Sequence, residues 1–212
     1  MGQRIRYFKN NNNKEIKDLI AAHYGDFRQW FLDHDQSSIA EFNEPFGNEI
    51  FKNYLIQNTD CEAGFEHLDK QLTDELTAEF IGGYCESPEA DNNILEFFGP
   101  AMSNWRYDLS TQRIIDTEDQ EFIRLWNYLI KGRSLKDDAA FVSYSNECKI
   151  GFLTFDEHRL VKRKIETYFG NIEKLQKRYW WANKEQNDGL CYVLTALNAM
   201  TMDNNELISV IE

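Results

Sequence analysis

Asp33, His34 and Asp35 place a histidine between two carboxylates. Such an arrangement suits proton transfer or the binding of a hard metal ion. A histidine at the end of a helix, however, more often serves as a polar residue that complements the helix dipole. We favour this second interpretation and predict no catalytic or metal-binding role for the three residues.

Cys61, Glu66 and His67 combine a nucleophile, a carboxylate and a base within a short stretch. A catalytic cysteine needs its base within hydrogen-bonding reach. Residues six apart on a helix point in different directions, so Cys61 and His67 do not form such a pair by themselves. The stretch therefore predicts no cysteine nucleophile.

Metal and cofactor motifs are missing from the chain. The segment KGRS at 131–134 lacks the spacing of a phosphate-binding loop and indicates a helix that ends at Gly132, and GxSxG, HExxH and GxGxxG do not occur. We predict no cofactor, no catalytic residue and no structural zinc. The cysteines form no CxxC pair and are expected to be free thiols: Cys61, Cys85, Cys148 and Cys191.

The charge of the chain is unevenly distributed. The net charge is −13, and residues 26–96 hold seventeen Asp and Glu against three Lys and Arg, a net charge of −14. Such a field repels nucleic acid and anionic membranes and speeds the encounter with a basic protein. The alternative is that these residues only keep the surface soluble. We predict a partner-binding surface made of Asp33, Asp35, Glu41, Glu44, Glu66 and Asp69.

One region mixes basic and aromatic residues, from Arg159 to Lys164 and from Lys174 to Trp181. Such a mixture can bind single-stranded nucleic acid by stacking and phosphate contact. The acidic segment opposes that function. We therefore interpret the region as a solvated helix face or as an intramolecular partner of the acidic residues.

Apolar periodicity predicts the elements that position these residues. Alternation over 3–8 indicates a strand, and the apolar stripe of 16–24 indicates a helix that Gly25 ends. Asp26 would then cap a short amphipathic segment that carries Trp30. Next come helices over 49–56 and 62–81, the second ending at Gly82 and Gly83, and a long loop over 84–104 with a short helix around 94–98.

The second half begins with a candidate strand over 105–109. Thr117 and Gln120 form a capping box for a helix whose apolar stripe includes Trp126, which we expect to be buried. The remaining predicted elements are strands over 140–145 and 148–153, a helix capped by Thr154 and Glu157, helices over 171–184 and 190–200, and a strand over 206–211.

The order of these elements indicates the fold class. Strands gather at both ends and in the middle of the chain, which favours an α+β fold with a small mixed or antiparallel sheet packed against several amphipathic helices. No repeat or linker divides the chain, so we predict one domain over 1–212. An apolar leader and a run of 18 apolar residues are both missing, so we expect a cytoplasmic protein.

Three segments carry a family likeness: FIRLWNYLIKGRS at 122–134, GFLTFDEHRLV at 151–161, and LCYVLTALNAM followed by ELISVIE at 190–212. Through them, residues 119–212 resemble the YfbM-like family of bacterial proteins, a domain of unknown function. The resemblance implies an α+β fold. Its motifs are packing signals, so it carries over no catalytic residue.

Two functions follow from these observations. The first is a non-enzymatic protein-interaction module that presents an acidic surface to a basic partner, for example in an immunity-type role. The alternative is an enzyme or a small-molecule-binding protein with a cleft near residues 84–104. We favour the first.

Overall fold

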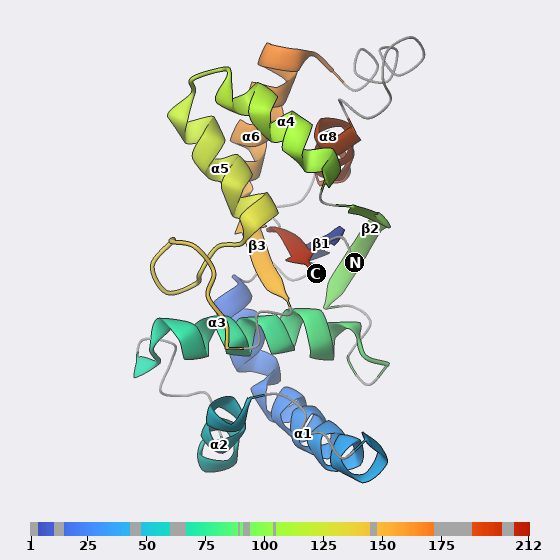
Figure 1. Ribbon diagram of the computed structural model, residues 1–212, viewed down its shortest axis with the longest axis vertical. Helices are drawn as coiled ribbons and strands as arrows, with labels where there is room; N and C mark the ends of the chain where they lie inside the picture. The colour runs from blue at the N-terminus through green and yellow to red at the C-terminus, as the bar shows by residue number, and fades with distance from the viewer. Residues whose placement is uncertain are drawn as a thin grey trace.

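A four-stranded antiparallel sheet lies between two layers of helices (Figure 1). The computed structural model describes residues 4–10, 15–42, 48–59, 67–88, 90, 94–103, 105–144, 148–171, 188–200 and 206–212. The expected α+β fold with an antiparallel sheet is confirmed. None of the helices in these ranges is long and apolar enough to cross a membrane.

The sheet has β1 and β4 at its centre. Ile5 lies opposite Ile211 and Lys9 lies opposite Leu207. All five residues of β4 are buried, as expected for a strand that is covered on both faces. The strands follow the order β2-β1-β4-β3: β1 (Arg4–Asn10), β2 (Leu95–Ser103), β3 (Lys149–Leu153) and β4 (Leu207–Ile211).

Each face of the sheet has its own group of helices (Figure 1). On one side lie α1 (Ile16–Phe42), α2 (Glu49–Gln57) and α3 (Lys70–Ala78), with a π-helical turn (Glu79–Gly83) and a 3-10 turn (Tyr84–Glu86). On the other side lie α4 (Trp105–Ile115), α5 (Gln120–Lys131), α6 (Phe155–Phe169) and α8 (Asp188–Ala199).

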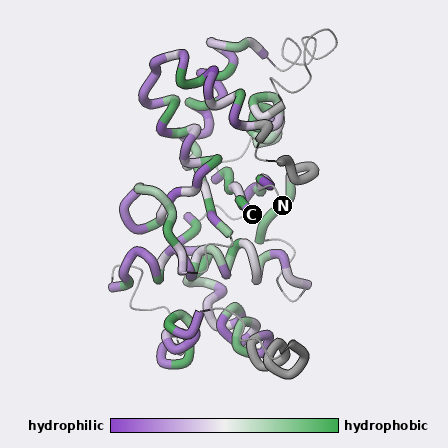
Figure 2. Tube along the Cα trace, viewed as in Figure 1, coloured by the Kyte–Doolittle hydropathy of each residue, from purple (hydrophilic) through white to green (hydrophobic). Residues whose placement is uncertain are grey.

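Alternation along the strands sends side chains into two cores. Phe8, Phe152 and Ile208 belong to the core shared with α1 and α3. Leu153 and Leu207 belong to the core shared with α5 and α6. β3 and β4 are therefore largely apolar, whereas β1 and the helices mix apolar and polar residues (Figure 2).

α5 lies so close to the sheet that only small residues fit beneath it. A Cβ atom on Gly151 would lie 2.1 Å from the carbonyl oxygen of Tyr128. Ser209 donates a hydrogen bond of 2.6 Å to the carbonyl oxygen of Leu129. The side chain of Trp126 is 1% exposed, which confirms the predicted register of this helix.

Arg133 joins the loop after α5 to β3 and α6. Its buried guanidinium lies against the rings of Tyr128 and Phe152, with centroids 4.4 and 4.5 Å away. It pairs with Asp138 at 2.8 Å and with Glu157 at 2.6 Å. Arginine suits this position because its planar group can stack and pair at once.

Several predicted features are confirmed. Gly132 ends α5 with a φ of 91°, and Thr154 and Glu157 form the capping box of α6. The predicted elements over 3–8, 49–56, 148–153, 190–200 and 206–211 correspond to β1, α2, β3, α8 and β4. Beyond Asn171, the helix predicted over 171–184 lies outside the described residues.

The predictions that Gly25 ends the first helix and that Asp26 caps a second are wrong. α1 runs through both residues to Phe42. The apolar stripe keeps its helical register beyond the glycine and buries Phe27 and Phe31 completely. Burying each ring contributes about 1.5–3 kcal/mol, which exceeds the cost of about 1 kcal/mol for a helical glycine.

Residues 62–66 of the helix predicted over 62–81 lie outside the described residues; α3 begins at Lys70, and the helical turns continue past Gly82 and Gly83. Neither glycine stops the helix. Both allow neighbouring side chains to pack closely against it. A Cβ atom added at Gly82 would lie 2.8 Å from Sγ of Cys148, and one added at Gly83 would lie 2.8 Å from Cη2 of Trp30.

Residues 84–104, predicted as a long loop with a short helix around 94–98, contain the strand β2 instead. Residues 105–109, predicted as a strand, are the start of α4. Pro100 is tolerated because β2 is an edge strand and its pairing with β1 shifts register in this region. Tyr107 and Ile114, seven residues apart, are both buried, which is a helical period. Asp119, not Thr117, caps α5 by accepting the Phe122 N–H at 3.0 Å.

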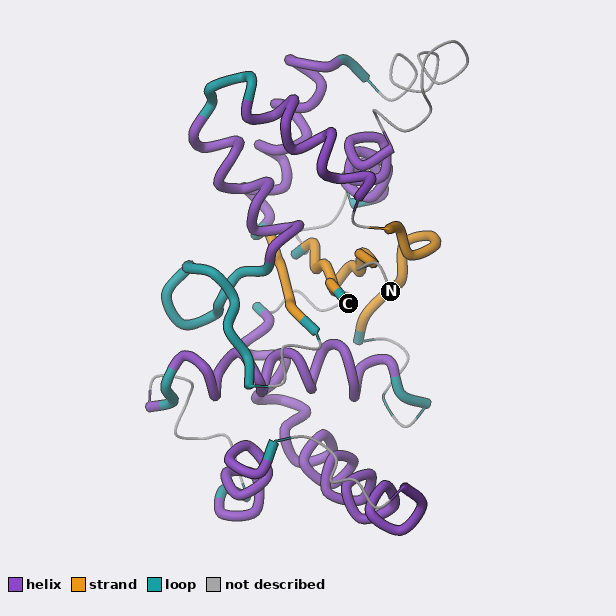
Figure 3. Tube along the Cα trace, in the orientation of Figure 1, coloured by secondary structure: helices purple, strands orange, loops and turns teal. Residues whose placement is uncertain are grey.

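Residues 140–144, predicted as part of a strand, form a loop that pairs with none of the described strands (Figure 3). Val142 donates its N–H to Asp74 at 2.8 Å, and Tyr144 donates to Glu75 at 2.7 Å. Carboxylates of α3 thus replace the carbonyl groups of a neighbouring strand. Both carboxylates are buried, and burial raises the pKa of Asp74.

Glu206 connects β4 to the start of α1. Its carboxylate accepts the N–H of Ile16, the first residue of α1, at 3.0 Å. A carboxylate at a helix N-terminus stabilises the helix. The side chain is nevertheless buried, and this burial raises the pKa of Glu206 to about 7.

Glu206→Gln should flatten the pH dependence of unfolding between about pH 4.5 and 7. Because the pKa of Glu206 is raised in the folded state, its contribution to the free energy of unfolding is complete below its unfolded pKa. This contribution is lost as the pH rises through about 7. The free energy of unfolding of the wild-type protein should therefore fall by up to about 3 kcal/mol across this window because of Glu206. Glutamine keeps an oxygen for the Ile16 N–H but does not titrate.

Urea unfolding at a series of pH values measures the difference. Glu166→Gln is the control, because Glu166 is an exposed glutamate of α6, and it should keep the wild-type slope. Equal slopes in the wild type and in Glu206→Gln would contradict the prediction.

Candidate functional site

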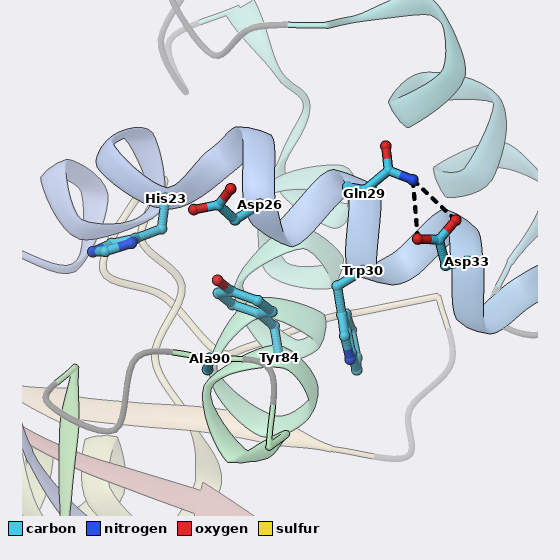
Figure 4. A pocket seen from close by; sticks show the side chains of 7 residues that line it. All are labelled: His23, Asp26, Gln29, Trp30, Asp33, Tyr84 and Ala90. Atoms are coloured by element: carbon cyan, nitrogen blue, oxygen red, sulfur yellow. Dashed lines mark hydrogen bonds between the residues drawn. The ribbon is translucent and has the colours of Figure 1, made fainter.

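A groove of about 640 Å³ lies between α1 and the segment that follows α3. α1 supplies one wall, and Tyr84 and Ala90 supply the other (Figure 4). The lining residues from α1 are His23, Asp26, Gln29, Trp30 and Asp33.

Helical spacing brings the polar lining residues together. Asp26 and Asp33 are seven residues apart, close to two full turns, so they project from nearly the same side of α1. Gln29 lies between them and donates through Nε2 to both carboxylate oxygens of Asp33, at 2.9 and 3.0 Å. Both aspartates are exposed to solvent.

The groove carboxylates lie in a part of the chain that is poor in Lys and Arg. Arg28 is the only Lys or Arg between positions 17 and 52. Its guanidinium turns toward α2, where Nε donates to the carbonyl oxygen of Leu55 at 2.6 Å. Within the described part of the chain, Asp26 and Asp33 form no ion pair.

Trp30 from the α1 wall and Tyr84 from the opposite wall meet at the floor of the groove. Trp30 and Tyr84 meet edge to face, with centroids 5.8 Å apart. The π-helical turn brings Gly83 directly beneath the Trp30 ring. Such turns are rare and occur often at functional sites. Both rings are largely buried.

The predicted partner surface is only partly described. Asp33 lies in the groove, whereas Asp69 caps α3 by accepting the N–H of Leu72 at 2.8 Å. Asp69 therefore has a structural role. The other predicted surface residues lie outside the described residues, either entirely (Glu44, Glu66) or by their side chains (Asp35, Glu41).

The sequence clusters do not form catalytic groups in the described residues. Nδ1 of His34 donates to the carbonyl oxygen of Trp30 at 2.9 Å, and its ring packs against the indole. Cys61 lies outside the described residues. Within the described ranges, no three His, Cys, Asp or Glu side chains are placed to hold a metal ion.

The basic region has an internal partner. Lys164 of α6 pairs with Asp119 at 2.6 Å and with Glu121 at 3.2 Å. Part of the region thus serves as an intramolecular partner of acidic residues, although these residues are the N-cap and first turn of α5 and not part of the 26–96 segment. The region's second part, from Lys174 to Trp181, lies outside the described residues.

Sequence reasoning missed His23, Asp26, Gln29 and Tyr84 as groove residues. The seven-residue spacing of Asp26 and Asp33 was an available signal. This spacing places the two residues on one side only if the helix is continuous. The predicted helix end at Gly25 therefore hid the signal.

Comparison with known proteins gives no relative for this chain: no family model, no curated protein and no solved structure matches it. The resemblance to the YfbM-like family therefore stays a prediction.

Gly83→Ala and Gly25→Ala should change stability in opposite directions. A methyl group at Gly83 would lie 2.8 Å from Trp30, and such overpacking costs about 1–3 kcal/mol. A methyl group at Gly25 would meet nothing within 4 Å and should stabilise α1 by about 0.5–1 kcal/mol. Urea denaturation of the two variants measures both effects, and a neutral Gly83→Ala would contradict the tight fit of the groove floor.

Proposed function

We propose that this protein is a non-enzymatic binding module whose groove binds positively charged side chains of a partner protein. One observation carries the proposal: Asp26 and Asp33 share one side of α1 at the groove, and neither forms an ion pair among the described residues. An immunity-type role, in which the groove masks a basic protein, is one form of this function.

The groove chemistry fits lysine and arginine. Two carboxylates supply the countercharges, and the Trp30 and Tyr84 side chains add apolar atoms to the lining. Lysine and arginine have apolar stems that pack on such surface while the charged head stays near water. Neither anions nor purely apolar ligands would gain from this combination.

Binding through this groove alone should be modest and fast. Each exposed ion pair contributes only about 0.2–1 kcal/mol. The net charge of −14 over residues 26–96 adds a long-range attraction that raises the association rate at low salt. A stable complex would therefore need further contacts around the groove.

A second candidate is the binding of a small organic cation. The groove includes Tyr84 and Ala90, so it lies at one end of the 84–104 region where the alternative function places a cleft. An enzyme usually excludes water from its reacting groups, whereas Asp26, Gln29 and Asp33 are exposed. This exposure favours binding over catalysis.

A reducing cytoplasm is the proposed location. Cys85 and Cys148 are free thiols. Burial raises the pKa of Cys148 to about 12, so this thiol stays protonated and unreactive. Thiols that remain unpaired are usual in that compartment.

The test uses fluorescein-labelled hexalysine and fluorescence anisotropy at about 20 and 300 mM salt. The double variant Asp26→Asn/Asp33→Asn should weaken binding about tenfold at low salt, because two exposed ion pairs are lost. High salt should reduce the difference.

The matched control is Asp108→Asn/Asp116→Asn, in α4 and directly after it, which changes the net charge equally. Asp116 accepts a hydrogen bond of 2.9 Å from Gln112, four residues earlier, as Asp33 does from Gln29. Equal loss in both double variants would show attraction by net charge alone and would overturn the proposal, as would unchanged binding in both.

A further inference from the structure

We propose that residues 134–144 form a strap that opens from α3 as a unit while the sheet stays folded, and that the buried Asp74 carboxylate weakens the closed state. The strap follows α5 and precedes β3, and Figure 3 shows it as a loop that reaches α3. This conformational step goes beyond the proposed cation binding, because the lining of the groove includes neither Asp74 nor any strap residue.

Side chains of α3, and not a strand ladder, hold the end of the strap. Asp74 accepts the N–H of Val142 at 2.8 Å, and Glu75 accepts the N–H of Tyr144 at 2.7 Å. The two acceptors are adjacent residues of one helix, so both hydrogen bonds break when this part of the strap leaves α3. Segments that are held by few hydrogen bonds open separately from the rest of a protein.

The closed strap holds the Asp74 carboxylate in an unfavourable place. The side chain is fully buried, and its Oδ1 atom has no hydrogen-bond partner among the described residues. Lys70, one turn earlier on α3, attracts the carboxylate, but the Lys70 ammonium binds Asp137 at 2.9 Å. Burial outweighs the contacts of Ser134 and Val142 with the carboxylate and raises the pKa of Asp74. Opening lets water reach the carboxylate, which removes the cost of burying it.

The ends of the strap lie close together, as in an Ω-loop. Gly132, directly before the strap, packs so tightly on Phe141 that an added Cβ atom would lie 2.7 Å from Cβ of Phe141. A loop with close ends can leave the surface without displacing the elements that flank it. Gly132 has a φ of 91° and no side chain, so it suits a hinge at the start of the strap.

The closed strap covers part of a core. Leu135 and Phe141, near its two ends, are buried in the core shared with α1 and α3. Between them, residues 136–140 form an exposed tip, which the N–H of Ser134 closes by binding the carbonyl oxygen of Ala139 at 2.9 Å. Opening therefore exposes two apolar side chains and the surface beneath them. A conformational step of this kind controls when an apolar surface is offered to a partner.

Amide hydrogen exchange, measured by NMR at about pH 7 and corrected for intrinsic rates, tests the proposal. In the wild type, the amides of Val142 and Tyr144 should exchange together and at least about 100-fold faster than that of Ile208 in the central strand β4. Asp74→Asn keeps an oxygen for the Val142 N–H and removes the charge. It should therefore slow the exchange of both strap amides about five- to tenfold.

Tryptic cleavage after Lys136 is the second measurement, because the exposed tip is cut only when the strap is open and the chain can extend. Asp74→Asn should slow this cleavage by the same factor as it slows the exchange. Asp116→Asn is the matched control, since it removes an exposed carboxylate far along the chain from the strap, and it should leave both rates unchanged.

Each contrary outcome has a distinct meaning. Exchange of Val142 and Tyr144 at the rate of Ile208 would show that the strap opens only when the whole protein unfolds, which would overturn the proposal. Unchanged or faster exchange in Asp74→Asn would show that the buried charge does not weaken the closed state, and would overturn the role of Asp74. Equal slowing in Asp116→Asn would attribute the effect to net charge and would overturn the same role.

Discussion

The pairing of β1 with β4 is the constraint on which the rest of the structure depends. It forms the centre of the sheet, and both cores are built on its two faces. Arg6 reinforces it by binding Glu212, 206 residues further along the chain, and Glu86 at the end of the 3-10 turn. Such distant contacts must overcome a large loop-closure entropy, and they do so because β4 buries all of its side chains.

The same central pair sets the position of the groove. Glu206, just before β4, accepts the N–H of Ile16, and its carbonyl oxygen accepts the N–H of Asn10 at the end of β1. The start of α1 is thereby tied to both central strands. From there α1 runs as one helix past the groove, where Trp30 packs on Gly83 and sets the distance to the opposite wall. The geometry of a solvent-exposed site thus originates in buried backbone contacts.

The sequence predicted those parts of the fold in which local and tertiary preferences agree. The stripe around Trp126, the capping box of α6 and the apolar run of β4 each carry their own signal. Predictions failed where a distant contact overrides a local preference, as at Gly25 and at Val142, whose N–H is bound by Asp74. The acidic region and Asp33 could be identified as candidates. The opposing wall of the groove could not, because only the tertiary fold brings Tyr84 to α1.

The described ion pairs distinguish carboxylates that serve the fold from those at the groove. Asp119 pairs with Lys164 and also caps α5. Glu157 pairs with Arg133 and also completes the capping box of α6. The groove carboxylates of α1 cap no helix and join no strand, and the nearby arginine is engaged by α2. Two exposed charges about 10 Å apart repel each other only weakly, because water and salt screen them. The fold therefore tolerates these carboxylates without requiring them, which leaves their charge available for a partner.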